Sequence, residues 1–264
     1  MSSIVRPTPA QMTRRLVVVG ATVFAIIAGQ LQQFGDLGQT PAEFSADSDA
    51  TLRVVGWAFA IWGPIYLGLI AYALRQVLPR TGESEMIGRF GWPSILALLG
   101  IGSWIVAAAL DAEVATIVLI FGSLAVLVIP LLKNAALIRS LGGRDMDRWL
   151  VAWPLGALAG WLTIASPVNL LTVATGNGDL PATFPPTVWA LLAIAGVAAF
   201  TLVVTWRTRL LAYPLPVSWG LLGVFVAEQA RGNETLAYGA LGASLVVLVA
   251  ALWITLGLRQ RHPG

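Results

Sequence analysis

The chain has no cysteine and only one histidine, His262, among its 264 residues. Disulfides, thiolate catalysis and cysteine-bound metals are therefore excluded. Without a usable histidine or cysteine, haem iron cannot be held by its commonest axial ligands, so any tetrapyrrole would be bound by stacking, hydrogen bonds and shape. No nucleophile–base constellation, HExxH motif or phosphate-binding glycine loop is present either. We expect no catalytic residues, no metal site and no enzymatic activity.

Charged residues are scarce as well. Asp, Glu, Lys and Arg make up 11% of the chain, whereas 57% of it is apolar. A soluble domain usually carries about a quarter charged residues, so the surface of this chain must face something other than water. The formal net charge is +3, but the cations stand at the ends of apolar runs rather than in one block. We therefore expect a membrane protein and no binding to nucleic acid.

Several apolar runs are long enough to cross a bilayer, since a helix of about 20 residues spans the hydrocarbon core. The sequence predicts an all-α fold, a polytopic membrane helical bundle of about eight transmembrane helices. The first run is the weakest because its uninterrupted apolar stretch, 16–28, is short. It follows Arg14 and Arg15, so a cleaved signal peptide is the alternative to a retained helix. The eight runs lie near residues 16–33, 54–78, 92–110, 114–133, 149–174, 188–206, 213–230 and 236–257.

The basic residues alternate between the connecting segments, and this alternation predicts an orientation. Cytoplasmic segments collect Lys and Arg because translocating a positive charge is disfavoured. One set of segments holds only Arg53 and Arg231, and the other set holds the rest of the 16 basic residues. We expect a multi-pass protein of the cell inner membrane, with both termini cytoplasmic.

The interiors of the predicted spans contain almost no ionisable groups, which are costly in a bilayer and usually mark ion or proton paths. Glu228, at the outer end of the seventh span, is the nearest candidate, and a surface pair with Arg231 is its expected role. This argues against a proton- or sodium-coupled pump. Small residues that let helices approach closely occur at Gly156, Gly160, Gly220 and Gly223.

Aromatic residues gather in the outer halves of three predicted spans. Phe59, Trp62 and Tyr66 are spaced i, i+3 and i+7, which places them along one helix face. Core packing would account for rings alone, but indole and phenol groups need partners in hydrocarbon. Apolar walls with a few polar groups are typical of a small-molecule site, and the long polar segment 34–52 is expected to act as its lid. The predicted ligand-binding residues are Trp57, Phe59, Trp62, Tyr66, Trp104, Trp161 and Asn169.

Several of these motifs resemble those of the tryptophan-rich sensory protein family (TspO/MBR, bacterial relatives of the mitochondrial translocator protein). Residues 62–66, Trp-Gly-Pro-Ile-Tyr, resemble the family's W-x-x-L-Y in the second helix. Ser103 and Trp104 resemble its N-x-x-W-S segment in helix three, and residues 154–169 resemble the P-Y…W-x-x-x-A-x-x-x-N run of helix five. The family's proline pair before the helix-two tryptophan is replaced by residues 53–56, Arg-Val-Val-Gly.

The resemblance implies a five-helix transmembrane unit over residues 14–175, followed by three additional helices over 187–258, with cytoplasmic tails at 1–13 and 259–264. It also implies a planar hydrophobic ligand, a porphyrin or an intermediate of the haem pathway, and no resident cofactor. We expect a sensor or carrier. The alternatives are a small-molecule transporter of the inner membrane and a structural or assembly subunit of a membrane complex. The expected partners are the lipid bilayer and a hydrophobic small molecule, with a homodimer left open.

Overall fold

The computed structural model describes residues 6–35, 38–46, 48–78 and 82–256. The predicted tail at 259–264 and residues 36, 37 and 47 of the predicted lid lie outside this described part. Every regular element within it is a helix, which confirms the predicted all-α bundle. The elements are α1 (Pro9–Gly35), α2 (Pro41–Ala46), η1 (Gly56–Ile61), α3 (Trp62–Val77), α4 (Glu85–Ala109), α5 (Glu113–Lys133), α6 (Ala135–Ser140), η2 (Arg148–Ala152), α7 (Trp153–Gly176), α8 (Pro186–Thr208), α9 (Pro214–Ala230) and α10 (Glu234–Leu256).

Seven helical segments of the described chain are long and apolar enough to cross a membrane, and they coincide with seven of the predicted spans. The remaining predicted span, 213–230, forms α9, which has 17 residues and is shorter than the usual transmembrane length of about 20. The non-helical chain before it is enclosed by protein, since Leu210, Ala212 and Tyr213 are all buried. Irregular backbone at membrane depth is tolerated where it is buried in protein.

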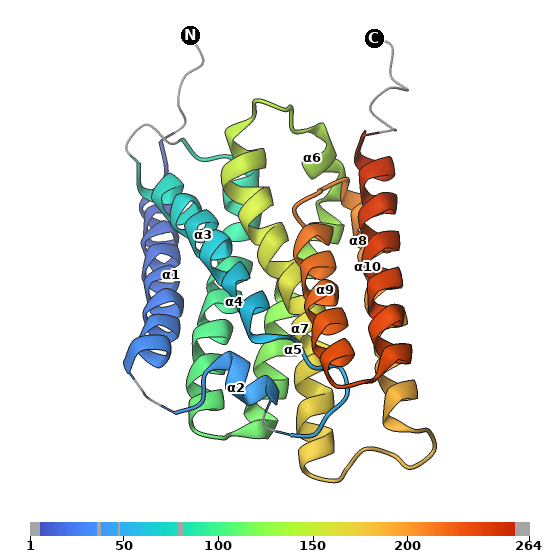
Figure 1. Ribbon diagram of the computed structural model, residues 1–264. Helices are drawn as coiled ribbons and strands as arrows, with labels where there is room; N and C mark the ends of the chain where they lie inside the picture. The colour runs from blue at the N-terminus through green and yellow to red at the C-terminus, as the bar shows by residue number, and fades with distance from the viewer. Residues whose placement is uncertain (1–5, 36–37, 47, 79–81, 257–264) are drawn as a thin grey trace.

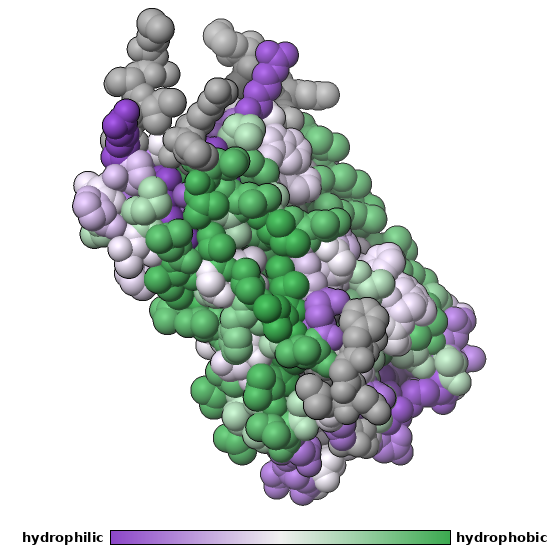
Figure 2. All heavy atoms as spheres, turned by 90° about the vertical axis from the view of Figure 1, so that its left-hand side faces the viewer, coloured by the Kyte–Doolittle hydropathy of each residue, from purple (hydrophilic) through white to green (hydrophobic). Residues whose placement is uncertain are grey.

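The outer surface of the bundle is apolar between two hydrophilic ends. Figure 2 shows a broad hydrophobic band on the α1 side of the molecule, with hydrophilic residues gathered towards the two ends. Leu16, Val23 and Ile27 of α1 are each about half exposed in this band. Such a wide apolar surface is rare on a soluble monomer, and it fits a protein surrounded by lipid.

The central helix of the bundle is α7. In the segment 148–176 that contains it, 72% of the apolar stretch is buried, compared with 28% for α8 and for α10. A Cβ added at Gly160 would lie 2.0 Å from the carbonyl oxygen of Tyr213, and one at Gly156 would lie 2.5 Å from the side chain of Leu210. The packing role predicted for these glycines is confirmed, because each lets the chain around α9 approach the backbone of α7.

The two sets of basic residues lie at opposite ends of the bundle. In Figure 1, α1 begins and α10 ends at the same end, where α3, α5 and α8 also end. Arg75, Lys133 and Arg207 stand in the last turns of those three helices. Arg53 and Arg231 lie at the other end, beside α2, where both pair with Asp49. The alternation along the chain thus becomes a separation in space.

Candidate functional site

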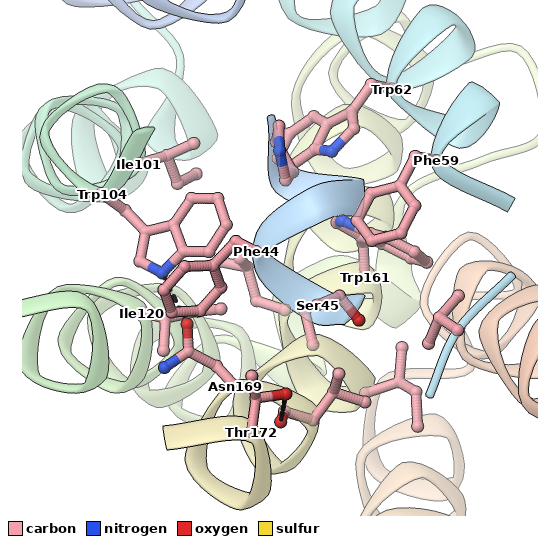
Figure 3. A pocket seen from close by; sticks show the side chains of 16 residues that line it. Phe44, Ser45, Phe59, Trp62, Ile101, Trp104, Ile120, Trp161, Asn169 and Thr172 are labelled. Atoms are coloured by element: carbon pink, nitrogen blue, oxygen red, sulfur yellow. Dashed lines mark hydrogen bonds between the residues drawn. The ribbon is translucent and has the colours of Figure 1, made fainter. Parts of the chain in front are cut away.

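A small cavity lies beneath α2, between η1, α3, α4, α5 and α7. Its volume is about 40 Å³, which is room for a few water molecules. Its walls are almost wholly apolar. Five of the predicted ligand-binding residues line it, and Figure 3 shows them around the space. They are Phe59, Trp62, Trp104, Trp161 and Asn169.

Two predicted residues, Trp57 and Tyr66, do not line the cavity. Trp57 is 47% exposed and packs edge-on against Trp219 of α9, with 5.0 Å between ring centroids. Tyr66 stacks on Trp62 at 5.2 Å, and its hydroxyl lies against α1, where a Cβ added at Gly29 would come within 2.4 Å of it. The sequence argument placed both residues in the pocket, and the structure places them on its flanks.

Both residues lie off the helix face that meets the cavity. Residues 56–61 form the 3₁₀ helix η1, in which residues three apart eclipse, so Phe59 and Trp62 point the same way. Trp57, two residues before Phe59, is turned away from that face in a 3₁₀ helix and in an α-helix alike. Tyr66 lies one α-helical turn beyond Trp62, where α3 meets α1.

The rings that do line the cavity converge on Trp161 of α7, which is 2% exposed. Phe59 lies 5.9 Å from it with an interplanar angle of 83°, and Trp62 lies 6.4 Å from it with an angle of 79°. Both arrangements are edge-to-face, the geometry that aromatic quadrupoles favour. The rings therefore pack on one another and leave only the small space described above.

Asn169 is a structural link in this fold. Its carboxamide oxygen accepts a hydrogen bond from Trp104 Nε1 at 2.9 Å. Its nitrogen donates to Thr116 Oγ1 at 3.0 Å. The side chain thereby joins α7 to α4 and α5, and it fixes the orientation of Trp104. We predicted Asn169 as a hydrogen-bonding partner of a ligand; each end of its amide already makes one bond within the protein.

Two other polar atoms of the lining residues have no partner. Trp62 Nε1 and Ser45 Oγ are buried without a hydrogen bond to any described residue. A buried polar group left unpaired costs about 1–3 kcal/mol, so a ligand that bonds to either atom would recover part of that cost. The described residues contain no group of three or more His, Cys, Asp or Glu that could hold a metal ion.

The short helix α2 covers the cavity. Its start is a capping box: Thr40 N–H donates to Glu43 Oε2 at 2.7 Å, and Glu43 N–H donates to Thr40 Oγ1 at 3.2 Å. Hydrogen bonding to its carboxylate from the backbone N–H of Thr40, and then from the Thr40 side chain, holds the pKa of Glu43 below its usual value. Pro41 in the first turn suits a helix start. The Thr-Pro-x-Glu pattern was readable in the sequence, although we predicted only an irregular lid there.

Phe44 extends from α2 into the site (Figure 3). It is 4% exposed and packs edge-on against Trp104, with ring centroids 5.9 Å apart. A second, open pocket of about 380 Å³ lies on the other side of Phe44, with Asp49 and Glu113 in its wall. Phe44 and Thr172 line both spaces. They therefore stand between the apolar cavity and a more polar pocket.

The helix α9 braces the segment that leads into η1. Val55 N–H donates to the carbonyl oxygen of Gly223 at 3.2 Å, and Trp219 Nε1 donates to the carbonyl oxygen of Ala58 at 2.8 Å. A Cβ at Gly223 would lie 2.8 Å from Ala58, so the two backbones are in close contact. The side of η1 opposite the cavity thus rests on a helix from the C-terminal part of the chain.

Glu228 completes this brace. The predicted pair with Arg231 is present at 3.2 Å, but Glu228 is fully buried rather than at the surface. Its carboxylate also accepts from Arg53 N–H at 3.0 Å and from Asn233 Nδ2 at 3.3 Å. A buried carboxylate needs such compensation. Here the bonds tie the end of α9 to the chain that enters η1.

The comparison with protein families covers nearly all of this architecture. Residues 15–253 match the family described as TSPO-like protein, a match that includes the aromatic cavity and extends through α8 and α9 into α10. No curated protein and no solved structure matches the chain. The matched segment contains the tryptophan motifs from which the family resemblance was read. The chain belongs to the TSPO-like protein family.

Proposed function

We propose that this membrane protein binds a planar hydrophobic ligand of the porphyrin class beneath α2, as a sensor or carrier. The observation that carries the proposal is an aromatic cavity in which two buried polar groups, Trp62 Nε1 and Ser45 Oγ, lack partners among the described residues. Flat aromatic surfaces on several sides suit a flat conjugated ligand. The two polar groups would fix its orientation.

Binding in this proposal requires α2 to move. The cavity of about 40 Å³ is far smaller than the sites of about 300–1,000 Å³ that hold drug-sized ligands. Displacing Phe44 would join it to the neighbouring pocket of about 380 Å³. Helices shorter than about 12 residues are marginal alone, and α2 has six. Its closed position therefore depends on the contact of Phe44 and on the Thr40–Glu43 cap.

The parts of the chain have different tasks in this proposal. The five-helix unit, 14–175, supplies the ligand site, and the additional helices, 187–258, support it through α9. The basic end of the bundle faces the cytoplasm, because positive charge resists translocation. The α2 end, and with it the mouth of the cavity, then faces the extracytoplasmic side of the inner membrane.

The ligand site can be tested by titrating the purified protein with a porphyrin and following the absorbance of the porphyrin. Trp161→Ala removes the ring on which the others converge, so we expect affinity to fall by at least about tenfold, as the loss of one stacked aromatic partner is worth about 1–3 kcal/mol. Trp62→Phe keeps the ring and removes only the unpaired N–H, and a smaller loss is expected. Trp253→Phe is the matched control, since Trp253 is 67% exposed on α10. Equal affinity in all four proteins would refute this site.

The orientation can be tested separately because the chain has no cysteine. Single cysteines at Asp49, beside α2, and at Arg144, at the other end, can be labelled with a membrane-impermeant maleimide on intact spheroplasts. We expect Asp49→Cys to react and Arg144→Cys to react only after the membrane is opened. The reverse pattern would place the cavity mouth in the cytoplasm.

A further inference from the structure

A third pocket, separate from the aromatic cavity, lies at the opposite end of the bundle. It is open, with about 290 Å³ of space, and is lined by Arg139 of α6 and by Trp206, Arg207 and Arg209 at the end of α8. The guanidinium of Arg139 donates to the carbonyl oxygen of Arg207. This bond holds α6 beside the end of α8 and brings together arginines that are distant in the sequence.

The charge of this pocket is not compensated within the described chain. None of its three arginines forms an ion pair with a described carboxylate. The Nε atom of Arg209 is also buried without a hydrogen-bond partner. Like charges around a partly enclosed space repel each other, so an anion in the pocket would stabilise it. Other arginines at the same end do pair with carboxylates, namely Arg14, Arg15, Arg75 and Arg89.

One wall of the pocket continues along the apolar surface of α8. Trp206 is 61% exposed, and Val203 is 54% exposed one turn further into the span. Val203 and Arg207 are four residues apart and therefore share a helix face. A ligand bound by the arginines would thus have an apolar track beside it, at the level where tryptophan rings meet lipid headgroups.

We propose that this pocket binds the phosphate of an anionic phospholipid, with an acyl chain lying along Trp206 and Val203. Guanidinium groups form strong, often bidentate hydrogen bonds with phosphate oxygens. Basic pockets between transmembrane helices are suited to anionic headgroups. Free phosphate could satisfy the arginines, but it would make no use of the apolar track, so the lipid is the occupant that the whole surface fits.

The test is native mass spectrometry of the full chain in detergent, with phosphatidylglycerol and phosphatidylcholine of identical acyl chains. We expect wild-type protein to retain phosphatidylglycerol preferentially. Arg207→Gln should weaken that retention by about fivefold, the usual effect of one basic residue at an anionic membrane surface. This variant keeps the backbone carbonyl that Arg139 binds, so the local fold is preserved. Arg209→Gln should also weaken the retention of phosphatidylglycerol, independently of Arg207→Gln.

Arg144→Gln is the matched control, because Arg144 is exposed at the same end of the bundle and lies outside the pocket. It should leave lipid retention unchanged. An equal loss in this control would show a general charge effect, and equal retention of both lipids would show no headgroup site. Displacement of phosphatidylglycerol by millimolar inorganic phosphate, but not by sodium chloride at the same ionic strength, would identify a free-phosphate site. Each of these three results overturns the proposal.

Discussion

Two pockets in the described part of the chain, one at each end of the bundle, are opposites in chemistry and differ in size. The cavity beneath α2 is aromatic, almost wholly apolar and limited to about 40 Å³. The arginine pocket beside α8 is cationic and several times larger, at about 290 Å³. Helices from distant parts of the sequence build both. The difference therefore lies in the side chains rather than in the way that helices are brought together.

Side-chain chemistry accounts for the difference in volume between the aromatic cavity and the arginine pocket. Aromatic rings attract each other edge-to-face, so an empty cavity lined by Trp161, Trp62 and Phe59 contracts until the rings touch. Guanidinium groups repel each other and prefer water or an anion between them. An apolar site is then small before its ligand enters, whereas a cationic site already has room for its ligand. Four predictions test this contrast.

The largest effect is expected where the chain that leads into α9 approaches α7, the helix that carries Trp161. Gly160→Ala places a Cβ 2.0 Å from the carbonyl oxygen of Tyr213, and a backbone clash of this kind has no flexible side chain to relieve it. We expect a loss of stability of about 3 kcal/mol or more, measured as a fall in the thermal unfolding temperature in detergent. Gly196→Ala is the control, since no atom lies within 4 Å of its added Cβ. Equal unfolding temperatures for the two variants would contradict the observed packing.

The second prediction enlarges the aromatic cavity by joining it to its neighbouring pocket. Phe44→Ala removes the ring that stands between the cavity and the pocket of about 380 Å³. We expect porphyrin to associate about tenfold faster, because a lid contact worth more than about 1.4 kcal/mol no longer has to be broken. Stopped-flow absorbance measures the rate. Phe121→Ala, at a 38% exposed position of α5, should leave it unchanged. An unchanged rate in Phe44→Ala would mean that the ligand enters by another route.

The third prediction concerns the contact by which α9 supports η1 on the side away from the cavity. Trp219→Phe removes the hydrogen bond to the carbonyl oxygen of Ala58 and leaves that oxygen without its partner. We expect a loss of about 1 kcal/mol of stability together with weaker porphyrin binding, although Trp219 does not line the cavity. Trp253→Phe serves again as the control. If stability falls while affinity is preserved, α9 stabilises the fold without positioning the site.

The smallest expected effect is a loss of stability of α2, the helix that covers the cavity, at low pH. The hydrogen bonds from Thr40 lower the pKa of Glu43, so the charged form stabilises the start of α2. That stabilisation is fully present above the ordinary pKa of a glutamate and is lost as the pH falls through the lowered value. As the pH is lowered through this range, we expect the amide hydrogens of α2 to lose protection. Their exchange rates should rise relative to the intrinsic rates of an unstructured peptide at the same pH. Glu43→Gln can still form a capping box and should abolish the pH dependence; if that dependence persists, another group controls the lid.

The features that were readable along the chain are those set by a few neighbouring residues. Seven spans, the separation of the basic residues and the packing role of Gly156 and Gly160 were predicted correctly. The cost of burying charge and the length needed to cross a bilayer act locally, so they leave a clear mark on the sequence. The tryptophan motifs were likewise sufficient to identify the family.

Other features depended on contacts between distant segments. Trp57 and Tyr66 lie outside the cavity because they pack on α9 and α1 instead, against Trp219 and Gly29. Asn169 was identified as an important polar group, but its partners Trp104 and Thr116 come from two other helices. Phe44 was missed because nothing in a short polar segment reveals which of its side chains will be buried.

Hydrophobicity and charge along the chain were thus sufficient to specify a membrane bundle, its ends and the residues from which an aromatic site could be built. The folded arrangement was needed to show which rings meet, which polar groups are already paired and which are left over. The same holds for the arginine pocket, since Arg139 and Arg207 are joined across two helices. Partition between lipid and water is a property of each segment, whereas pairing and cavity shape are properties of contacts that exist only once distant segments have packed together.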